Sequence, residues 1–282
     1  MKKKLISLLL SLIVILSFSI SSIYADTNNK GKVIYLSLNR TSLENLLEIP
    51  IIKEKTSNSG YVALMTTKGD GSNTDQKSFA SIGSGVRANV LDEDYVKFET
   101  LNENEKTQFE AATGVKSWAI GNIKINRNIN QNTDNGGYGA TLGMLGTTLN
   151  KNNLKVALLG NSDIKKNDDL KKIRNLALVC MDENGRVQSG NVDNINKKDD
   201  TMPFGISTDY DKLKSETKKY YENNDAIFVE LGDTYRLDEY KNNLNENTYK
   251  SMKKKIYQNI NDYLKDVFEM AGKNDTIYIV SE

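Results

Sequence analysis

Short runs of apolar residues alternate with amphipathic stretches along the chain from Val33 onward. Four of the runs, at residues 33–38, 155–159, 226–231 and 276–280, are continuously apolar, as strands covered on both faces require. Such alternation is typical of βα units, in which helices lie on both sides of a mostly parallel sheet. The pattern therefore predicts an α/β fold: a three-layer α/β/α sandwich with a mainly parallel central sheet.

Helical spacing is clearest near the end of the chain. Between residues 245 and 271 the apolar positions recur every three or four residues, which predicts a long amphipathic helix packed on one face of the sheet. A shorter helix is expected through Leu43, Leu46 and Leu47, with Thr41 or Ser42 as its N-cap. The glycine-laced segment Tyr138–Leu149 predicts a helix that packs tightly on the sheet.

Two further segments give weaker signals. Residues 176–181 and 186–188 flank an Asn-Gly turn, and such a turn between apolar runs predicts a β-hairpin. Tyr61–Thr66 is an additional apolar run in the βα series.

The first 25 residues combine a basic start, an apolar stretch and small residues before Ala25, which predicts an export signal. The alternative is an uncleaved membrane anchor, because Ile23 is larger than signal cleavage prefers. Either interpretation places the protein outside the cytoplasm, with membrane contact only through this segment. The domain organisation predicted is therefore residues 1–25 as signal or anchor and residues 32–282 as one α/β domain.

Charge and composition narrow the chemistry. Removing Lys2, Lys3 and Lys4 with the signal reduces the 38 basic residues to 35, against 37 acidic ones. This near-neutral balance lacks the basic face that nucleic acid binding requires, so nucleic acid is not an expected partner. The chain has no histidine, which excludes a Ser-His-Asp triad and any imidazole metal ligand. The single cysteine, Cys180, lies in an apolar run and is expected to be a buried apolar side chain.

Three stretches of the chain are informative together: VIYLSLNRTS near the start, residues 73–87 (NTDQKSFASIGSGVR) and the terminal NDTIYIVSE. They resemble segments of the alkaline phosphatase superfamily, the metal-dependent group that includes cofactor-independent phosphoglycerate mutases and phosphopentomutases. They follow the family's order. The segments LGNSD, MDENG and ELGDT are similar to those of exported proteins of gram-positive bacteria that carry a degenerate form of this domain. Because the chain stops two residues after an apolar run, the resemblance implies a domain that is incomplete at its C-terminus.

The resemblance implies a site of two divalent metals and a Ser or Thr nucleophile, with the metals activating the nucleophile and neutralising developing charge. At the tip of the first strand the family's Asp is replaced by Asn39, a poorer ligand. At the nucleophile, gapless alignment places Asp75, with Thr74 one residue away and Ser72 three away. The histidine-bearing part is absent.

Four more residues complete the candidate site. Asp233 follows a central strand where the resemblance implies a metal ligand, and the alternative is a helix N-cap. Arg87 and Arg236 are candidates to clamp a carboxylate or phosphate, against the alternative of ordinary surface arginines. Arg40 joins them, because ligand sites of open α/β sheets lie beyond the strand carboxyl ends. Asn39, Thr74 and Asp233 are therefore expected to converge.

The leading functional hypothesis is an exported, alkaline-phosphatase-like domain with eroded metal and nucleophile positions. It would bind a small anionic ligand or an envelope component without turnover. One alternative is an active phosphohydrolase or phosphotransferase that uses Thr74, with Asp233 binding zinc, magnesium or manganese; only this alternative requires a cofactor. The other is a purely structural envelope protein.

Overall fold

The structure is a computed structural model that describes residues 30–66, 68–90, 96–125, 129, 137–166 and 169–282. The predicted signal or anchor, residues 1–25, lies outside the described residues. Within those ranges, no helix combines the length and the apolar character needed to cross a membrane.

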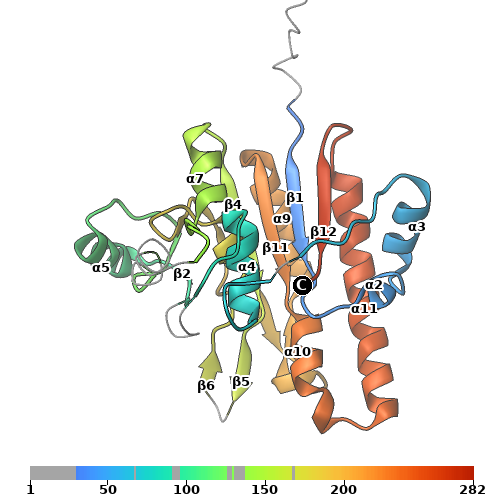
Figure 1. Cartoon of the computed structure of the whole chain (residues 1–282). Helices are drawn as coiled ribbons and strands as arrows, with labels where there is room; N and C mark the ends of the chain where they lie inside the picture. The colour runs from blue at the N-terminus through green and yellow to red at the C-terminus, as the bar shows by residue number, and fades with distance from the viewer. Residues whose placement is uncertain (1–29, 67, 91–95, 126–128, 130–136, 167–168) are drawn as a thin grey trace, which may run out of the picture.

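A five-stranded parallel sheet forms the centre of the molecule (Figure 1). Its strands lie in the order β12-β1-β11-β4-β8, and every neighbouring pair is parallel. The strands are β1 (Val33–Ser37), β4 (Val156–Asn161), β8 (Ser189–Asn191), β11 (Ala226–Leu231) and β12 (Thr276–Val280). The prediction that the four continuous apolar runs share one parallel sheet is confirmed.

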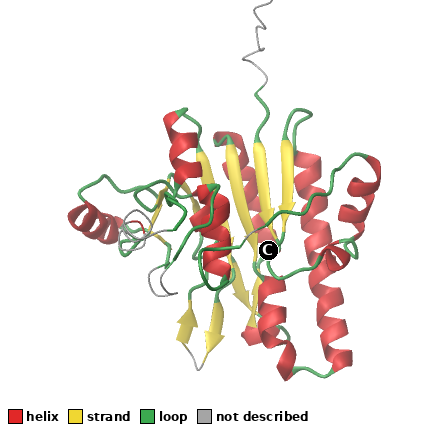
Figure 2. Ribbon diagram, viewed as in Figure 1, coloured by secondary structure: helices red, strands yellow, loops and turns green. Residues whose placement is uncertain are grey.

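Helices cover both faces of this sheet (Figure 2). Successive strand residues alternate between two cores: Leu158 and Phe228 belong to one, and Leu159 and Val229 belong to the other. The first core is covered by α4 (Asp75–Ser84), α7 (Met144–Lys151) and α8 (Ala177–Cys180). The second is covered by α2 (Leu43–Leu46), α3 (Pro50–Asn58), α9 (Tyr210–Asn223), α10 (Asp233–Tyr240) and α11 (Glu246–Met270). The α/β prediction is thus confirmed at the level of a parallel sheet between helices.

The long helix α11 has the predicted place and extent. Asn245 caps it, its side chain accepting a hydrogen bond from the Thr248 amide at 2.9 Å. Ile256, Ile260 and Leu264 are fully buried against the sheet. Near the other end of the chain, Ser42 caps α2, as one of the two predicted alternatives requires.

Small elements extend from the central sheet. Besides the central sheet there are one three-stranded antiparallel sheet and two antiparallel pairs of strands. The helix α5 (Glu103–Thr113) lies beside the three-stranded sheet. The three sets of strands consist of β2 (Glu99–Thr100), β3 (Ile120–Gly121) and β7 (Arg186–Val187); β5 (Ile164–Lys166) and β6 (Asp169–Lys171); and β9 (Asn196–Lys198) and β10 (Ile206–Thr208). Two short 3-10 turns lie beside α10. Pro203–Gly205 contacts α10 from another part of the chain, and Lys241–Asn243 follows α10 directly in sequence.

The predicted hairpin at residues 176–188 is wrong. The Asn-Gly turn forms, with Gly185 at φ 72°, but the apolar run before it is the helix α8. A fully buried apolar run does not distinguish strand from helix by its pattern. Close backbone contact favours the helix here, since a Cβ at Gly83 would lie 2.4 Å from the Leu178 carbonyl oxygen.

Two other expectations need correction. The helix predicted over Tyr138–Leu149 begins only at Met144. Its Gly146 lies against the backbone of Met181 at the end of α8, and the helix α7 also contacts β4 of the sheet. The apolar run Tyr61–Thr66 forms no strand, and Tyr61 and Leu64 are 100% and 88% exposed. Cys180 is buried as expected, and burial raises the pKa of its thiol.

Candidate functional site

The carboxyl ends of β1, β4, β11 and β12 meet at one edge of the sheet, beside the N-terminus of α4. In Figure 1 the label at the end of the chain lies at this edge, and α10 and the β5–β6 hairpin extend beyond it. The register pairs Ser37 with both Glu230 and Val280, so polar side chains at the strand tips are brought together. We call Ser37, Asn39, Arg40, Asp75, Ser162 and Glu230 the carboxyl-edge cluster.

A buried chain of hydrogen bonds links three strand ends of this cluster. The Ser37 hydroxyl donates to the Asn39 side-chain oxygen at 2.5 Å, and the Asn39 amide donates to Glu230 at 3.2 Å. The Ser162 hydroxyl donates to the same Glu230 oxygen at 2.5 Å. Asn39 is only 2% exposed. Its amide is therefore engaged within the protein and does not face an open site.

Glu230 is the centre of that chain, and it is 1% exposed. Burial raises the pKa of Glu230 to about 7, and the negative charge of Asp163 adds to this rise. The Ser162 hydrogen bond and the Arg236 charge act in the opposite direction without outweighing burial. At neutral pH this carboxyl is consequently protonated to a larger extent than an ordinary glutamate.

Arg40 lies immediately after Asn39 and gathers three carboxylates around its guanidinium. Its Nη2 lies 2.7 Å from an Asp75 oxygen and its Nη1 lies 3.3 Å from Asp238, with Glu239 also bound to Nη1. Burial is the largest single influence on the Arg40 pKa and acts to lower it, but the charge of Asp75 and the hydrogen bonds to Asp75 and Glu239 together outweigh it, so the pKa is raised. The positively charged guanidinium of Arg40 therefore pairs with the carboxylates of this edge.

The backbone of Arg40 is itself unusual. Its φ of 56° lies in the left-handed region, which costs an L-residue about 1–2 kcal/mol. The guanidinium carbon lies 4.5 Å from the centre of the Tyr235 ring, so a cation–π contact adds to the ion pairs. These contacts offset the backbone strain and fix the guanidinium over the end of the sheet.

Thr74 is the N-cap of α4, and its hydroxyl accepts a hydrogen bond from the Lys77 amide at 3.3 Å. Thr74 and Ser72 are exposed, and the Ser72 hydroxyl lies 3.4 Å from the Lys77 ammonium. Asp75 lies next to Thr74 and is bound to Arg40, which brings these three predicted residues to the same edge as Asn39.

Asp233 and Arg236 form a second, fully buried network. Gly232, not Asp233, is the N-cap of α10; Asp233 is its first residue. One Asp233 oxygen accepts from Arg236 at 2.7 Å and from the Thr208 amide at 3.0 Å. Arg236 is 0% exposed and also donates to Asn161 and Asn196. Both side chains are buried in the protein interior, so this ion pair holds the surrounding elements together and does not face a ligand site.

Arg87 lies apart from the cluster. It follows the C-terminus of α4, a ten-residue helix about 15 Å long, whose N-terminus carries Thr74. Its guanidinium donates to the Tyr138 hydroxyl at 2.9 Å and lies over that ring. Arg87 and Thr74 are thus at opposite ends of one helix, and the structure does not bring Arg87 to the strand tips.

Sequence reasoning missed two groups. Glu230 is the lone charge inside the apolar strand AIFVEL, and a charge in such a run is a signal that a buried polar partner lies opposite. Arg174 was also missed: it is 2% exposed and is bound to Asp163 at 2.9 Å and Asp193 at 2.7 Å. No local pattern marks Arg174, because its partners are distant in sequence or on another element.

The residues at this edge do not fit the metal pair that the family resemblance implies. Asn39 stands in place of a carboxylate and is hydrogen-bonded to Glu230. Asp75 and Asp233 are each paired with an arginine. Across the described ranges, no group of three or more acidic or cysteine side chains is arranged to hold a metal ion.

Comparison of the chain with family models, with curated proteins and with solved structures finds no match.

Proposed function

We propose that this chain is an exported binding domain of the alkaline-phosphatase-like kind that has lost catalysis. In this proposal the carboxyl edge of the sheet is a former catalytic site that now recognises a ligand or partner at the cell envelope. The proposal combines the sequence resemblance with the contacts of the carboxyl-edge cluster.

The observation that carries the proposal is the position of the Arg40 guanidinium. It is bound by Asp75, the residue that aligns with the family's nucleophile, and by Asp238 and Glu239. A divalent ion needs free carboxylate oxygens, and the Arg40 guanidinium engages one oxygen of each of these three carboxylates. An arginine therefore takes the electrostatic place of a metal but activates no nucleophile and offers no open coordination position.

Exposure separates the residues that can touch a ligand from those that cannot. Asn39, Asp233 and Arg236 are each at most 2% exposed, so their role is to hold the strand tips in place. Ser72 and Thr74 are exposed, and the Arg40 and Asp75 side chains are 28% and 27% exposed. We assign ligand contact to these four residues.

The charge at this edge modifies the ligand expected from the sequence. Arg40 and Lys241 face three carboxylates, since Asp238 is shared between the two cations. The Lys77 ammonium, 3.4 Å from the Ser72 hydroxyl, brings the cations to three, so these groups have no excess of positive charge to attract a small anion. A polar group of an envelope partner fits this edge better.

The test is phosphate release from p-nitrophenyl phosphate by the purified full chain with zinc, magnesium or manganese. We expect a rate equal to the metal-only blank, because no metal is held near Thr74 to activate it. Thr74→Ala is expected to leave that rate unchanged. Metal-dependent phosphate release that Thr74→Ala abolishes would refute the proposal and establish the active phosphotransfer alternative.

A further inference from the structure

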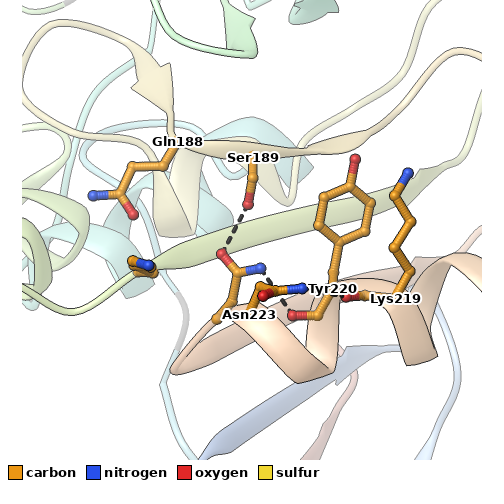
Figure 3. A pocket seen from close by; sticks show the side chains of 7 residues that line it. Gln188, Ser189, Lys219, Tyr220 and Asn223 are labelled. Atoms are coloured by element: carbon orange, nitrogen blue, oxygen red, sulfur yellow. Dashed lines mark hydrogen bonds between the residues drawn. The ribbon is translucent and has the colours of Figure 1, made fainter.

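A pocket of about 400 Å³ lies at the opposite, amino-terminal edge of the sheet. Figure 3 shows its walls: the residues before β4 and β8 on one side and the last turn of α9 on the other. The volume is within the range of small-molecule sites. The pocket shares no residue with the carboxyl-edge cluster.

Hydrogen bonds within the protein use most of the acceptors in these walls. The Gln188 side-chain oxygen accepts from the Val156 amide at 2.7 Å. The Ser189 hydroxyl donates to the Asn224 oxygen at 2.8 Å, and the Asn224 amide donates to the Tyr220 carbonyl at 2.8 Å (Figure 3). These bonds fix the side chains and leave the Gln188 NH2 as a donor, while the Asn223 NH2 donates to the Lys219 carbonyl at 3.3 Å and leaves the Asn223 oxygen as an acceptor.

The donors that remain are positively charged or strongly polar. Among the described residues, the Lys155 ammonium and the Gln188 side-chain NH2 have no hydrogen-bond or ion-pair partner. The Lys219 ammonium lies 3.4 Å from a Glu216 oxygen and 4.9 Å from the centre of the Tyr220 ring. No acidic residue lines the pocket. Two ammonium groups and an amide donor suit a ligand that is rich in acceptors and negatively charged.

The C-terminus of α9 would otherwise oppose an anion, because the carbonyl end of a helix is negative. Lys32 removes this opposition: its ammonium donates to the Asn224 carbonyl at 3.0 Å and also to the Tyr221 carbonyl. The negative helix end is therefore already paired with a cation, and Lys155 and Lys219 remain for a ligand.

Tyr220 supplies a fixed aromatic wall. Its hydroxyl donates to the Gly190 carbonyl at 3.0 Å, which holds the ring against the start of β8. The ring stands between Ser189 and Lys219 in Figure 3. The carboxamide of Asn223 lies on the same helix turn and lines the pocket as well. An aromatic ring beside carboxamides suits a sugar, whose C–H groups pack on the ring while its hydroxyls bond the amides.

We propose that this pocket binds an acidic sugar, a hexose unit that carries a carboxylate or a phosphate. Lys155 and Lys219 pair with the acidic group, Gln188 and Asn223 bond the hydroxyls, and Tyr220 packs against the ring. The inference stands on the pocket alone and does not depend on the function proposed for the carboxyl edge.

The test is titration of the isotope-labelled full chain with glucuronate, glucose 6-phosphate, glucose and inorganic phosphate, followed by amide chemical shifts. We expect at least one acidic sugar to shift the signals of Gln188, Ser189 and Tyr220. Removing charge-assisted contacts is expected to weaken this binding at least about tenfold in Lys155→Gln/Lys219→Gln. The matched control, Lys151→Gln/Lys218→Gln, removes two exposed lysines outside the pocket and is expected to keep the affinity.

The pattern of the four probes decides the assignment. Glucose binding as tightly as glucuronate and glucose 6-phosphate overturns the role of charge. Inorganic phosphate binding as tightly as glucose 6-phosphate, with no binding of glucuronate, overturns the sugar. Absence of shifts at these residues with about 20 mM of either acidic sugar overturns the proposal, and this reading uses the unmodified chain, so it is independent of how the variants fold.

Discussion

The two edges of the central sheet differ in how their charged groups are satisfied. At the carboxyl edge, the arginines at positions 40 and 236 are surrounded by acceptors of the protein itself. At the amino edge, Lys155 and Gln188 keep donors without partners among the described residues, in a pocket of about 400 Å³. In many α/β sheets the carboxyl edge is the site of ligand binding. Here the arginines of that edge are paired within the protein although Ser72 and Thr74 are exposed, and those donors without partners lie at the other edge.

The largest expected effect at the carboxyl edge comes from breaking the buried ion pair of Arg236 with Asp233. Removing one partner from a buried ion pair leaves an uncompensated charge, so Arg236→Met is expected to lower the free energy of unfolding by about 3–5 kcal/mol. Urea denaturation measures this change. Arg87→Met, at the exposed arginine beyond α4, is the matched control and is expected to change stability by less than about 1 kcal/mol. Equal losses in the two variants would contradict the structural place of Arg236.

Measuring the free energy of unfolding over a range of pH tests whether Glu230 is buried and protonated at the carboxyl edge. Burial raises the pKa of Glu230 to about 7 in the folded protein, above the 4.5 of a free glutamate. The folded state therefore holds a proton that the unfolded state releases, so the contribution of Glu230 to stability is greatest below pH 4.5 and falls as pH rises toward 7. Glu230→Gln is expected to remove about 1–3 kcal/mol of this fall between pH 5 and pH 8.

The control for this series is Glu103→Gln, at a side chain that is 91% exposed. Glu282, whose pKa is raised to about 9 by burial and by the charge of Asp75, accounts for the part of the slope that persists in Glu230→Gln. A pH profile of Glu230→Gln identical to that of the unmodified chain would show that Glu230 ionises normally.

Thr74 gives a smaller effect that separates a structural role from a chemical one. Loss of an N-cap hydroxyl costs about 1 kcal/mol, so Thr74→Ala is expected to lower stability by that amount. Thr74→Ser keeps a capping oxygen and is expected to restore most of it. Thermal unfolding of the three proteins measures the difference. A Thr74→Ala variant as stable as the parent would remove the cap from the account.

The sequence predicted the sheet well because strand identity is a local property. The runs at β1, β4, β11 and β12 are short and apolar, which favours strands of a parallel sheet; β4 and β11 are buried throughout, whereas β12 is a partly exposed edge strand. Residues 176–181 were misassigned because α8 is buried on all sides, where periodicity carries no information. Local pattern therefore predicted strands better than buried helices.

Contacts join some of the residues predicted for the candidate site, and Arg87 lies apart from them. The rule that strand carboxyl ends converge brought Asn39, Arg40 and Asp75 to one edge, as their mutual contacts and those with Glu230 support. The inward direction of Asp233 and Arg236 was not predictable, because it depends on the Thr208 amide and Asn161, which the chain brings from distant elements. The direction of a side chain at a strand end depends on partners that the fold brings from other elements, which local sequence does not reveal.

The central claim is that the Arg40 guanidinium, and no metal ion, is the cation of the carboxyl edge. Manganese titration of the full chain, followed by the paramagnetic resonance signal of the free ion, tests it directly. The unmodified chain is expected to bind no stoichiometric Mn²⁺ below about 1 mM. Arg40→Ala frees Asp75 and Glu239, and leaves Asp238 paired only with Lys241, so it is expected to bind Mn²⁺ measurably more tightly. Stoichiometric Mn²⁺ binding by the unmodified chain that Asp75→Asn abolishes would contradict the account.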